Sequence, residues 1–253
     1  SGGPITMLNA EAIGDVQFLA GGFPACYENR LSSVLEVGLR EGSRERFEAE
    51  FDLSMAGAGL LAEGPLGKRG SWLLTGRRSY LDLIAGAYGI EGAVPQYANY
   101  EAKVVYDLSP RHRLSLISHG GWDEIHFDPD LEDEDQPSNV KVKSSGWRTV
   151  TGLSLRSVLG TSGVLTLSVG EVLNNYLSDA WDKDLEGQLI ERNRSLEGQT
   201  TAKGDLSLRL PYGGWLRAGA SAQRIDATLD IQLPRGTENF FSAEATRINQ
   251  VAV

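Results

Sequence analysis

Cysteine is almost missing from this chain of 253 residues, which contains a single one, Cys26. One cysteine excludes a disulfide within the chain and a zinc site built from cysteine ligands. It does not reveal whether the protein resides in an oxidising or a reducing compartment.

Long apolar runs are missing as well. No stretch approaches the roughly 20 consecutive apolar residues that a membrane-spanning helix requires, and the mean hydropathy is −0.24. This excludes spanning by helices. It does not exclude spanning by a β-barrel, because only every second residue of a barrel strand faces lipid.

Basic residues are in the minority, since 24 Lys and Arg stand against 34 Asp and Glu and give a formal net charge of −10. Proteins bind nucleic acid chiefly by neutralising phosphates with Lys and Arg. Nucleic acid is therefore not an expected partner.

Complete catalytic motifs are absent from the sequence. Lys68 is followed by Arg69, where a phosphate-binding loop has Ser or Thr, and the residues around Ser221 lack the closing Gly of a nucleophile elbow. His112, His119 and His126 do not have the spacing of a metal triad. The sequence predicts neither an enzyme nor a bound metal or cofactor.

Alternating segments are what the sequence does have. In 196–210 the odd positions are polar and the even positions are apolar, Thr or Gly. Successive side chains of a strand point to opposite faces, so such a strand has one apolar and one wet face. We predict strands at 45–55, 58–66, 71–84, 97–108, 112–126, 147–159, 163–177, 194–210 and 214–231, with another starting at 247.

The predicted connections alternate in length. Short ones lie at 67–70, 109–111, 160–163 and 211–214, and long ones at about 85–96, 127–146, 178–193 and 232–246; a tight turn at 55–57 is the exception. Short turns on one side and long loops on the other are typical of outer-membrane barrels, whose tilted strands need about 9–11 residues to cross the bilayer. The pattern predicts an all-β fold and a transmembrane antiparallel β-barrel.

Aromatic residues gather near the ends of the predicted strands, Trp72, Trp122, Trp147, Trp181 and Trp215 among them. In a membrane barrel such residues form interfacial girdles. Aromatic residues are also favoured in strands of any kind, which leaves both interpretations open.

One run near the N-terminus carries a family signature. Gly-Gly-Phe-Pro-Ala-Cys-Tyr-Glu-Asn-Arg-Leu-Ser-Ser-Val-Leu-Glu-Val at 21–37, followed by Arg-Glu-Gly at 40–42, resembles the end of the plug domain of TonB-dependent outer-membrane receptors. Residues 2–5 and 16–22 are similar to earlier plug strands, and 47–53, 63–67 and 72–83 to the first barrel strands.

The resemblance implies a domain division and a function. Residues 1–43 would be the C-terminal part of a plug domain, and 44–253 the N-terminal part of the barrel, about nine or ten of roughly 22 strands. Such a receptor lies in the bacterial outer membrane, surrounded by its lipid, and takes up a scarce bulky ligand such as an iron–siderophore complex, a corrinoid or a glycan. Its energy comes from the TonB–ExbB–ExbD complex, which acts through a segment missing from this sequence.

Charged residues of the plug are candidates for contacts with the barrel. We expect Arg30 and Arg40 to pair with acids on the inner wall of the barrel, unless they are surface charges without a defined partner. The candidate acids are Glu48, Glu50, Glu101 and Glu171.

A second group of candidate residues lies in the acidic segment at 122–135. It could contact a cation or a cationic ligand through oxygen atoms, although the spacing is not that of an EF-hand and a solvated loop is the simpler interpretation. The candidate residues are Asp123, Glu124, His126, Asp128 and Asp130.

Two alternative functions remain open at this stage. The first is an outer-membrane barrel that is structural or adhesive and does not transport, and the second is a soluble all-β binding module. We also expect the sequence to be a piece of a longer protein, because 247–253 begins an alternating strand and 1–5 contains no initiator Met.

Overall fold

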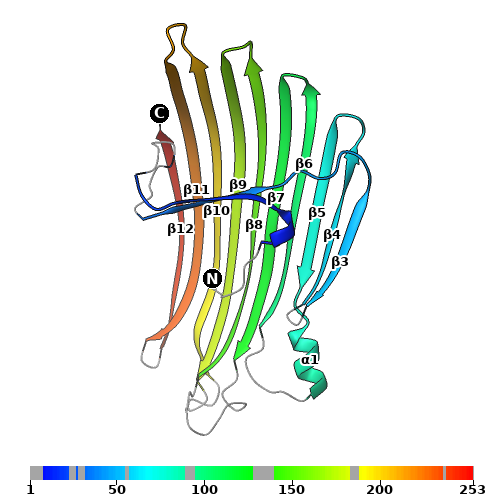
Figure 1. Ribbon diagram of the computed structural model, residues 1–253. Coiled ribbons are helices and arrows are strands. Elements are labelled where there is room, and N and C mark those ends of the chain that lie inside the picture. Colours follow the sequence, from blue (N-terminus) through cyan, green and yellow to red (C-terminus); the bar gives the residue numbers. More distant parts are fainter. Residues whose placement is uncertain are drawn as a thin grey trace.

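The computed structural model describes residues 8–22, 27, 32–54, 57–88, 95–127, 140–182, 188–235 and 238–252. The alternating segments form one antiparallel sheet of ten strands, in which each strand pairs with its neighbour in the sequence (Figure 1). These are β3 (Glu48–Ser54), β4 (Gly57–Leu66), β5 (Gly70–Arg78), β6 (Gln96–Ser109), β7 (His112–Phe127), β8 (Val140–Leu159), β9 (Gly163–Asp182), β10 (Gln188–Arg209), β11 (Trp215–Arg235) and β12 (Glu238–Ala252).

The sheet is curved and open. Its order runs from β12 to β3 without closure, so these two strands are its edges among the described residues. The prediction of an all-β antiparallel fold is confirmed.

The short turns lie where the sequence predicts them, at the upper end of the sheet in Figure 1. Gly67, Gly160 and Gly213 adopt φ values of 62°, 61° and 89° there. This left-handed conformation is accessible to Gly at no steric cost, so each glycine allows the chain to reverse within a few residues.

At the opposite end, two of the predicted long loops are largely strand. β9 continues to Asp182 and β10 begins at Gln188, and β11 and β12 are separated by 236–237 alone. A polar side chain stabilises the extension of β9 and β10, because Arg194 donates to the carboxylate of Asp179 at 2.5 Å and to the Ser178 carbonyl at 3.1 Å. The polar composition that predicted loops therefore belongs to paired strand ends.

The predicted strand at 71–84 is too long, because β5 ends at Arg78 and a helix, α1 (Leu81–Tyr88), follows. Ser79 Oγ accepts a hydrogen bond from the Leu81 amide at 3.3 Å, which satisfies a donor at the start of the helix. No helix of the described part of the chain is long and apolar enough to cross a membrane.

The N-terminal segment forms a separate two-stranded sheet of β1 (Ile13–Leu19) and β2 (Val34–Leu39), preceded by the 3-10 helix η1 (Ala10–Ala12). In Figure 1 it crosses the strands of the large sheet. A small apolar contact joins the two sheets, since Ala12 and Leu39 are buried with Leu73 of β5.

The large sheet has two chemically distinct faces. On the face that we call polar, Thr75, Glu101 and His119 are cross-strand neighbours. On the other, which we call apolar, large hydrophobic side chains are exposed, including Phe51 at 68%, Leu74 at 47% and Leu167 at 47%. Exposed apolar area of this extent indicates a contact surface.

Candidate functional site

The N-terminal segment is held to the polar face by an ion pair between Arg40 and Glu63. Arg40, directly after β2, donates from both terminal nitrogens to the Glu63 carboxylate of β4, at 2.6 and 2.9 Å. The Ser43 amide donates to the same carboxylate at 2.9 Å. The hydrogen bonds that Arg40 donates to Glu63 raise the pKa of the guanidinium above its usual value, so Arg40 stays charged.

Glu101 is the second anchor. Its side chain is fully buried on β6, where it accepts hydrogen bonds from the Asn9 amide at 3.0 Å, from Asn99 Nδ2 at 3.3 Å and from Thr75 Oγ1. His119 Nδ1 lies 3.7 Å from the same carboxylate. A buried carboxylate with several donors is well compensated, and one donor here comes from the N-terminal segment.

Four charged side chains form a ring at the link between the two sheets, residues 40–47. Arg44 contacts Asp107 of β6 at 2.7 Å and Glu41 at 3.0 Å. Arg113 of β7 closes the ring, donating to Asp107 at 2.7 Å and to Glu41 at 2.9 Å. The hydrogen bond to Asp107 also raises the pKa of Arg44.

The register places three of the four predicted acids on the polar face. Glu48 and Glu50 of β3 pair with Glu63 and Leu61, and so share the face that carries Glu101. The carboxylate that binds Arg40 is nevertheless Glu63, while Glu48 accepts from Arg46 at 2.9 Å.

Glu171 differs from the expectation, because it lies on the apolar face. Its cross-strand neighbours are Thr151 of β8 and Thr200 of β10, in the row next to Leu153 and Val169. The alternation within β9 is the physical reason: residues 165, 167 and 169 are apolar and face the same way as 171. Arg30 lies outside the described residues.

The candidates of the acidic segment do not converge on one point. Asp123 belongs to the polar face, whereas Glu124 and His126 alternate to the other face, where Glu124 pairs with Lys143 at 3.1 Å. Asp128 and Asp130 lie outside the described residues. Across the described part of the chain, no group of three or more His, Cys, Asp or Glu side chains is arranged to hold a metal ion.

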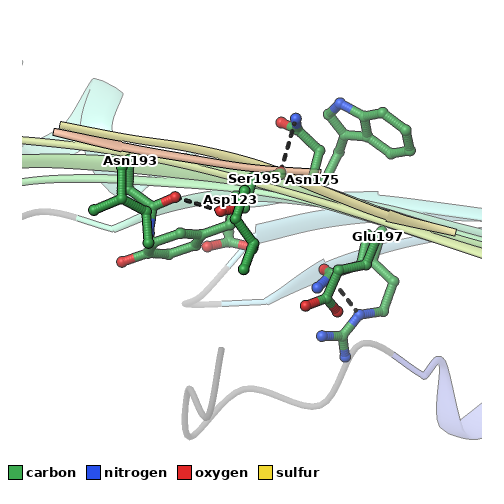
Figure 2. A pocket seen from close by; sticks show the side chains of 12 residues that line it. Asp123, Asn175, Asn193, Ser195 and Glu197 are labelled. Atoms are coloured by element: carbon green, nitrogen blue, oxygen red, sulfur yellow. Dashed lines mark hydrogen bonds between the residues drawn. The ribbon is translucent and has the colours of Figure 1, made fainter. Parts of the chain in front are cut away.

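The polar face also carries a hollow of about 300 Å³ over β7 to β11. Figure 2 shows Asp123, Asn193, Ser195 and Glu197 on one side of the sheet there, with the Asn175 side chain on the other side. The lining residues are Asp123, Gly146, Trp147, Arg148, Asn174, Asn175, Tyr176, Asn193, Ser195, Glu197, Leu229 and Ile231.

Sequence reasoning missed Glu63 and most of the hollow. A signal for Glu63 exists, because it is the only charged residue of β4, and a lone acid in an otherwise uncharged strand needs a partner. The hollow has no such signal, because its residues come from five strands that only the register brings together.

Comparison with known proteins does not add a family. No protein-family model matches the sequence, and no curated protein matches it.

Proposed function

We propose that this chain is part of a TonB-dependent outer-membrane receptor, in which β3 to β12 are consecutive strands of the barrel wall and the N-terminal segment is part of the plug. One observation carries the proposal. A long antiparallel sheet exposes one apolar face, and its polar face binds the preceding segment through charged and polar side chains.

Strand length supports the membrane part of the proposal. β8, β9 and β10 contain 20, 20 and 22 residues, and a tilted strand crosses the hydrocarbon core with about 9–11. The surplus would extend into water, which agrees with the ion pair between Arg194 and Asp179 near the end of β9 and the start of β10.

The distribution of side chains along the apolar face gives a second support. Leu165, Leu167 and Val169 of β9 are followed on this face by Glu171. Two rows further, Trp122 and Trp147 lie opposite each other and Trp147 pairs with Asn175. An apolar band bordered by polar residues and then aromatic rings is the outer surface expected of a membrane barrel.

The contacts of the N-terminal segment favour a receptor over a barrel that does not transport. Arg40, Asn9 and Lys103 all take part in polar contacts between the N-terminal segment and the large sheet. Among the residues with a described structure, the buried apolar contact consists of Ala12, Leu39 and Leu73. A plug that must move during transport is better held by exchangeable polar contacts than by a dry apolar core.

The apolar face argues against a soluble binding module. In a soluble protein it would have to pack against a second layer, and no element of the described chain covers it. We further propose that the transported ligand is scarce and bulky, and that TonB–ExbB–ExbD supplies the energy.

Fractionation of cells that express the full-length protein tests the proposal. We expect the protein in the outer membrane, with a faster migration on unheated than on heated denaturing gels, and ligand-dependent growth that is lost in a strain without TonB. Recovery in the soluble fraction would overturn the membrane assignment. Growth independent of TonB would overturn the receptor assignment alone.

A further inference from the structure

The hollow on the polar face is built from successive cross-strand rows. Arg148, Asn174 and Glu197 are neighbours in the first row. In the second row, Gly146 lies between Asp123 and Tyr176, and Ser195 follows. Asn193 belongs to a third row, nearer the end of the sheet that carries the connections 128–139 and 183–187.

Gly146 creates the space between Asp123 and Tyr176. A Cβ atom at this position would lie 2.7 Å from the carbonyl oxygen of Asn175, so a side chain could not be added without displacing backbone. The missing side chain leaves a gap in a row whose other members are polar or aromatic.

The lining offers hydrogen-bond donors and acceptors together. Arg148 Nε donates to Asn174 Oδ1 at 3.3 Å, and Ser195 Oγ donates to Asn193 Oδ1 at 2.5 Å, so these side chains orient one another. Carboxylates only accept and guanidinium only donates, whereas hydroxyl and amide groups do both. Ligand hydroxyls, which are donors and acceptors at once, match this mixture.

The charge of the lining disfavours anions. Its charged side chains are two carboxylates, Asp123 and Glu197, and one guanidinium, Arg148. An anionic ligand, such as an iron complex with a carboxylate or catecholate chelator, would meet net negative charge. A neutral ligand meets no such penalty.

Apolar surface lies beside the polar groups. Tyr176 is 41% exposed on the polar face, and Leu229 and Ile231 line the same hollow. An exposed aromatic ring provides a flat, rigid contact surface at low entropic cost. The C–H face of a sugar ring fits such a surface while its hydroxyls reach the surrounding polar groups.

We infer that this hollow is a contact site for a neutral, hydroxyl-rich ligand of the oligosaccharide class. The inference rests on the proposed function. In an outer-membrane barrel the short turns face the periplasm, and the hollow lies further from the short turns than the contact between Asn9 and Glu101. In such a receptor the hollow would therefore be on the outer side of the plug. Its volume of about 300 Å³ is at the lower limit of ligand pockets, about 300–1,000 Å³, so it would hold part of a chain that extends further along the barrel wall.

Binding of the purified full-length protein to an array of neutral and anionic oligosaccharides, with ferric citrate as a separate titration, tests the inference. We expect at least one neutral oligosaccharide to bind. Tyr176→Ala and Asn193→Ala should each weaken that binding at least tenfold. Ser168→Ala, a change on the polar face of β9 outside the hollow, should leave it unchanged.

Three results would overturn the inference: no neutral glycan on the array binds, ferric citrate or anionic glycans bind instead, or the two hollow variants bind as the unchanged protein does. Outer-membrane location and TonB-dependent growth are measured on the same variants. If they persist while glycan binding is absent, the ligand class is wrong and the receptor assignment stands.

Discussion

Three acidic side chains join the two sheets, and their exposure to water determines how strongly a substitution of each should lower the stability. Glu101 is fully buried, the Glu63 side chain is 9% exposed and that of Asp107 is 26% exposed. Charges in water interact weakly, whereas donors left unpaired in a buried place carry a large desolvation penalty. The acids should therefore differ in the size and the salt dependence of their effects.

Glu101→Ala should be among the most destabilising single changes in the sheet. It would remove the acceptor for the Asn9 amide, Thr75 Oγ1 and Asn99 Nδ2, and each unsatisfied buried donor costs about 1–3 kcal/mol. The temperature at which the full-length protein unfolds on gels should fall clearly, and less for Glu101→Gln, which keeps one acceptor oxygen. An unchanged unfolding temperature for the alanine variant would contradict this.

Glu63→Ala should loosen the N-terminal segment without unfolding the sheet. The change removes both hydrogen bonds from Arg40 and the one from the Ser43 amide, and bonds to charged groups contribute about 1.5–3 kcal/mol each, less for the one-third exposed Arg40. Amide hydrogen exchange in β2 and at Ser43 should accelerate.

Glu50→Ala is the matched control for this change. Glu50 is an acid of the same face on the neighbouring strand and takes no part in the contacts of Arg40. Exchange in β2 should remain slow in this variant. Equal acceleration in both variants would show that the Arg40–Glu63 pair has no specific role.

At the scale of elements, the β6–β7 turn is tied to the link between the two sheets by the ring of Glu41, Arg44, Asp107 and Arg113. All four side chains are partly exposed. Salt screens exposed pairs, because the Debye length shrinks from about 10 Å at 0.1 M to about 3 Å at 1 M.

Asp107→Asn should therefore lower the free energy of unfolding by about 1 kcal/mol or less per ion pair at low salt. This loss of stability should be smaller at 1 M salt. Thermal unfolding of the variant and the unchanged protein at the two salt concentrations measures this. For Glu63→Ala the loss should persist at high salt, since its side chain is nearly buried. A loss of stability for Asp107→Asn that is independent of salt would mean that packing, and not electrostatic attraction, stabilises the ring.

The two faces of β9 permit a direct test with neighbouring residues. Leu167 lies on the apolar face and Ser168 on the polar face. Arg on the lipid side of a barrel costs about 2–4 kcal/mol at the midplane, and a lumen position tolerates it. In the full-length protein, Leu167→Arg should lower the yield of folding into phosphatidylcholine vesicles, and Ser168→Arg should leave that yield unchanged. Equal yields for both variants would contradict a lipid contact on this face.

At the scale of the whole molecule, the large sheet has two open edges, β3 and β12, among the residues that the structure describes. In lipid each unpaired backbone group of an edge costs several kcal/mol, so that only closed barrels are stable. Residues 1–253 expressed alone should therefore not insert into vesicles, whereas the full-length protein should, as read from protease protection. Stable insertion of the segment alone as a monomer would oppose the proposal that further strands close this sheet.

Part of this fold could be predicted residue by residue. The alternation in 196–210, the turns at Gly67 and Gly160 and most strand bounds follow from the two-residue period of a strand and from the conformational freedom of glycine. The extent of β9 and β10 could not be predicted, because their polar ends are stabilised by Arg194 reaching a neighbouring strand. α1 was missed because its apolar residues also suit a strand.

That the chain forms antiparallel strands with one apolar and one polar side follows from the amino-acid sequence, since this pattern depends on neighbours along the chain. Which charged side chains meet depends instead on how the strands are assembled in three dimensions. Glu63 and not Glu48 binds Arg40, Glu171 faces away from the N-terminal segment, and five strands together form the hollow. Such contacts depend on register across strands, and a shift of one residue would turn every side chain of a strand to the other face.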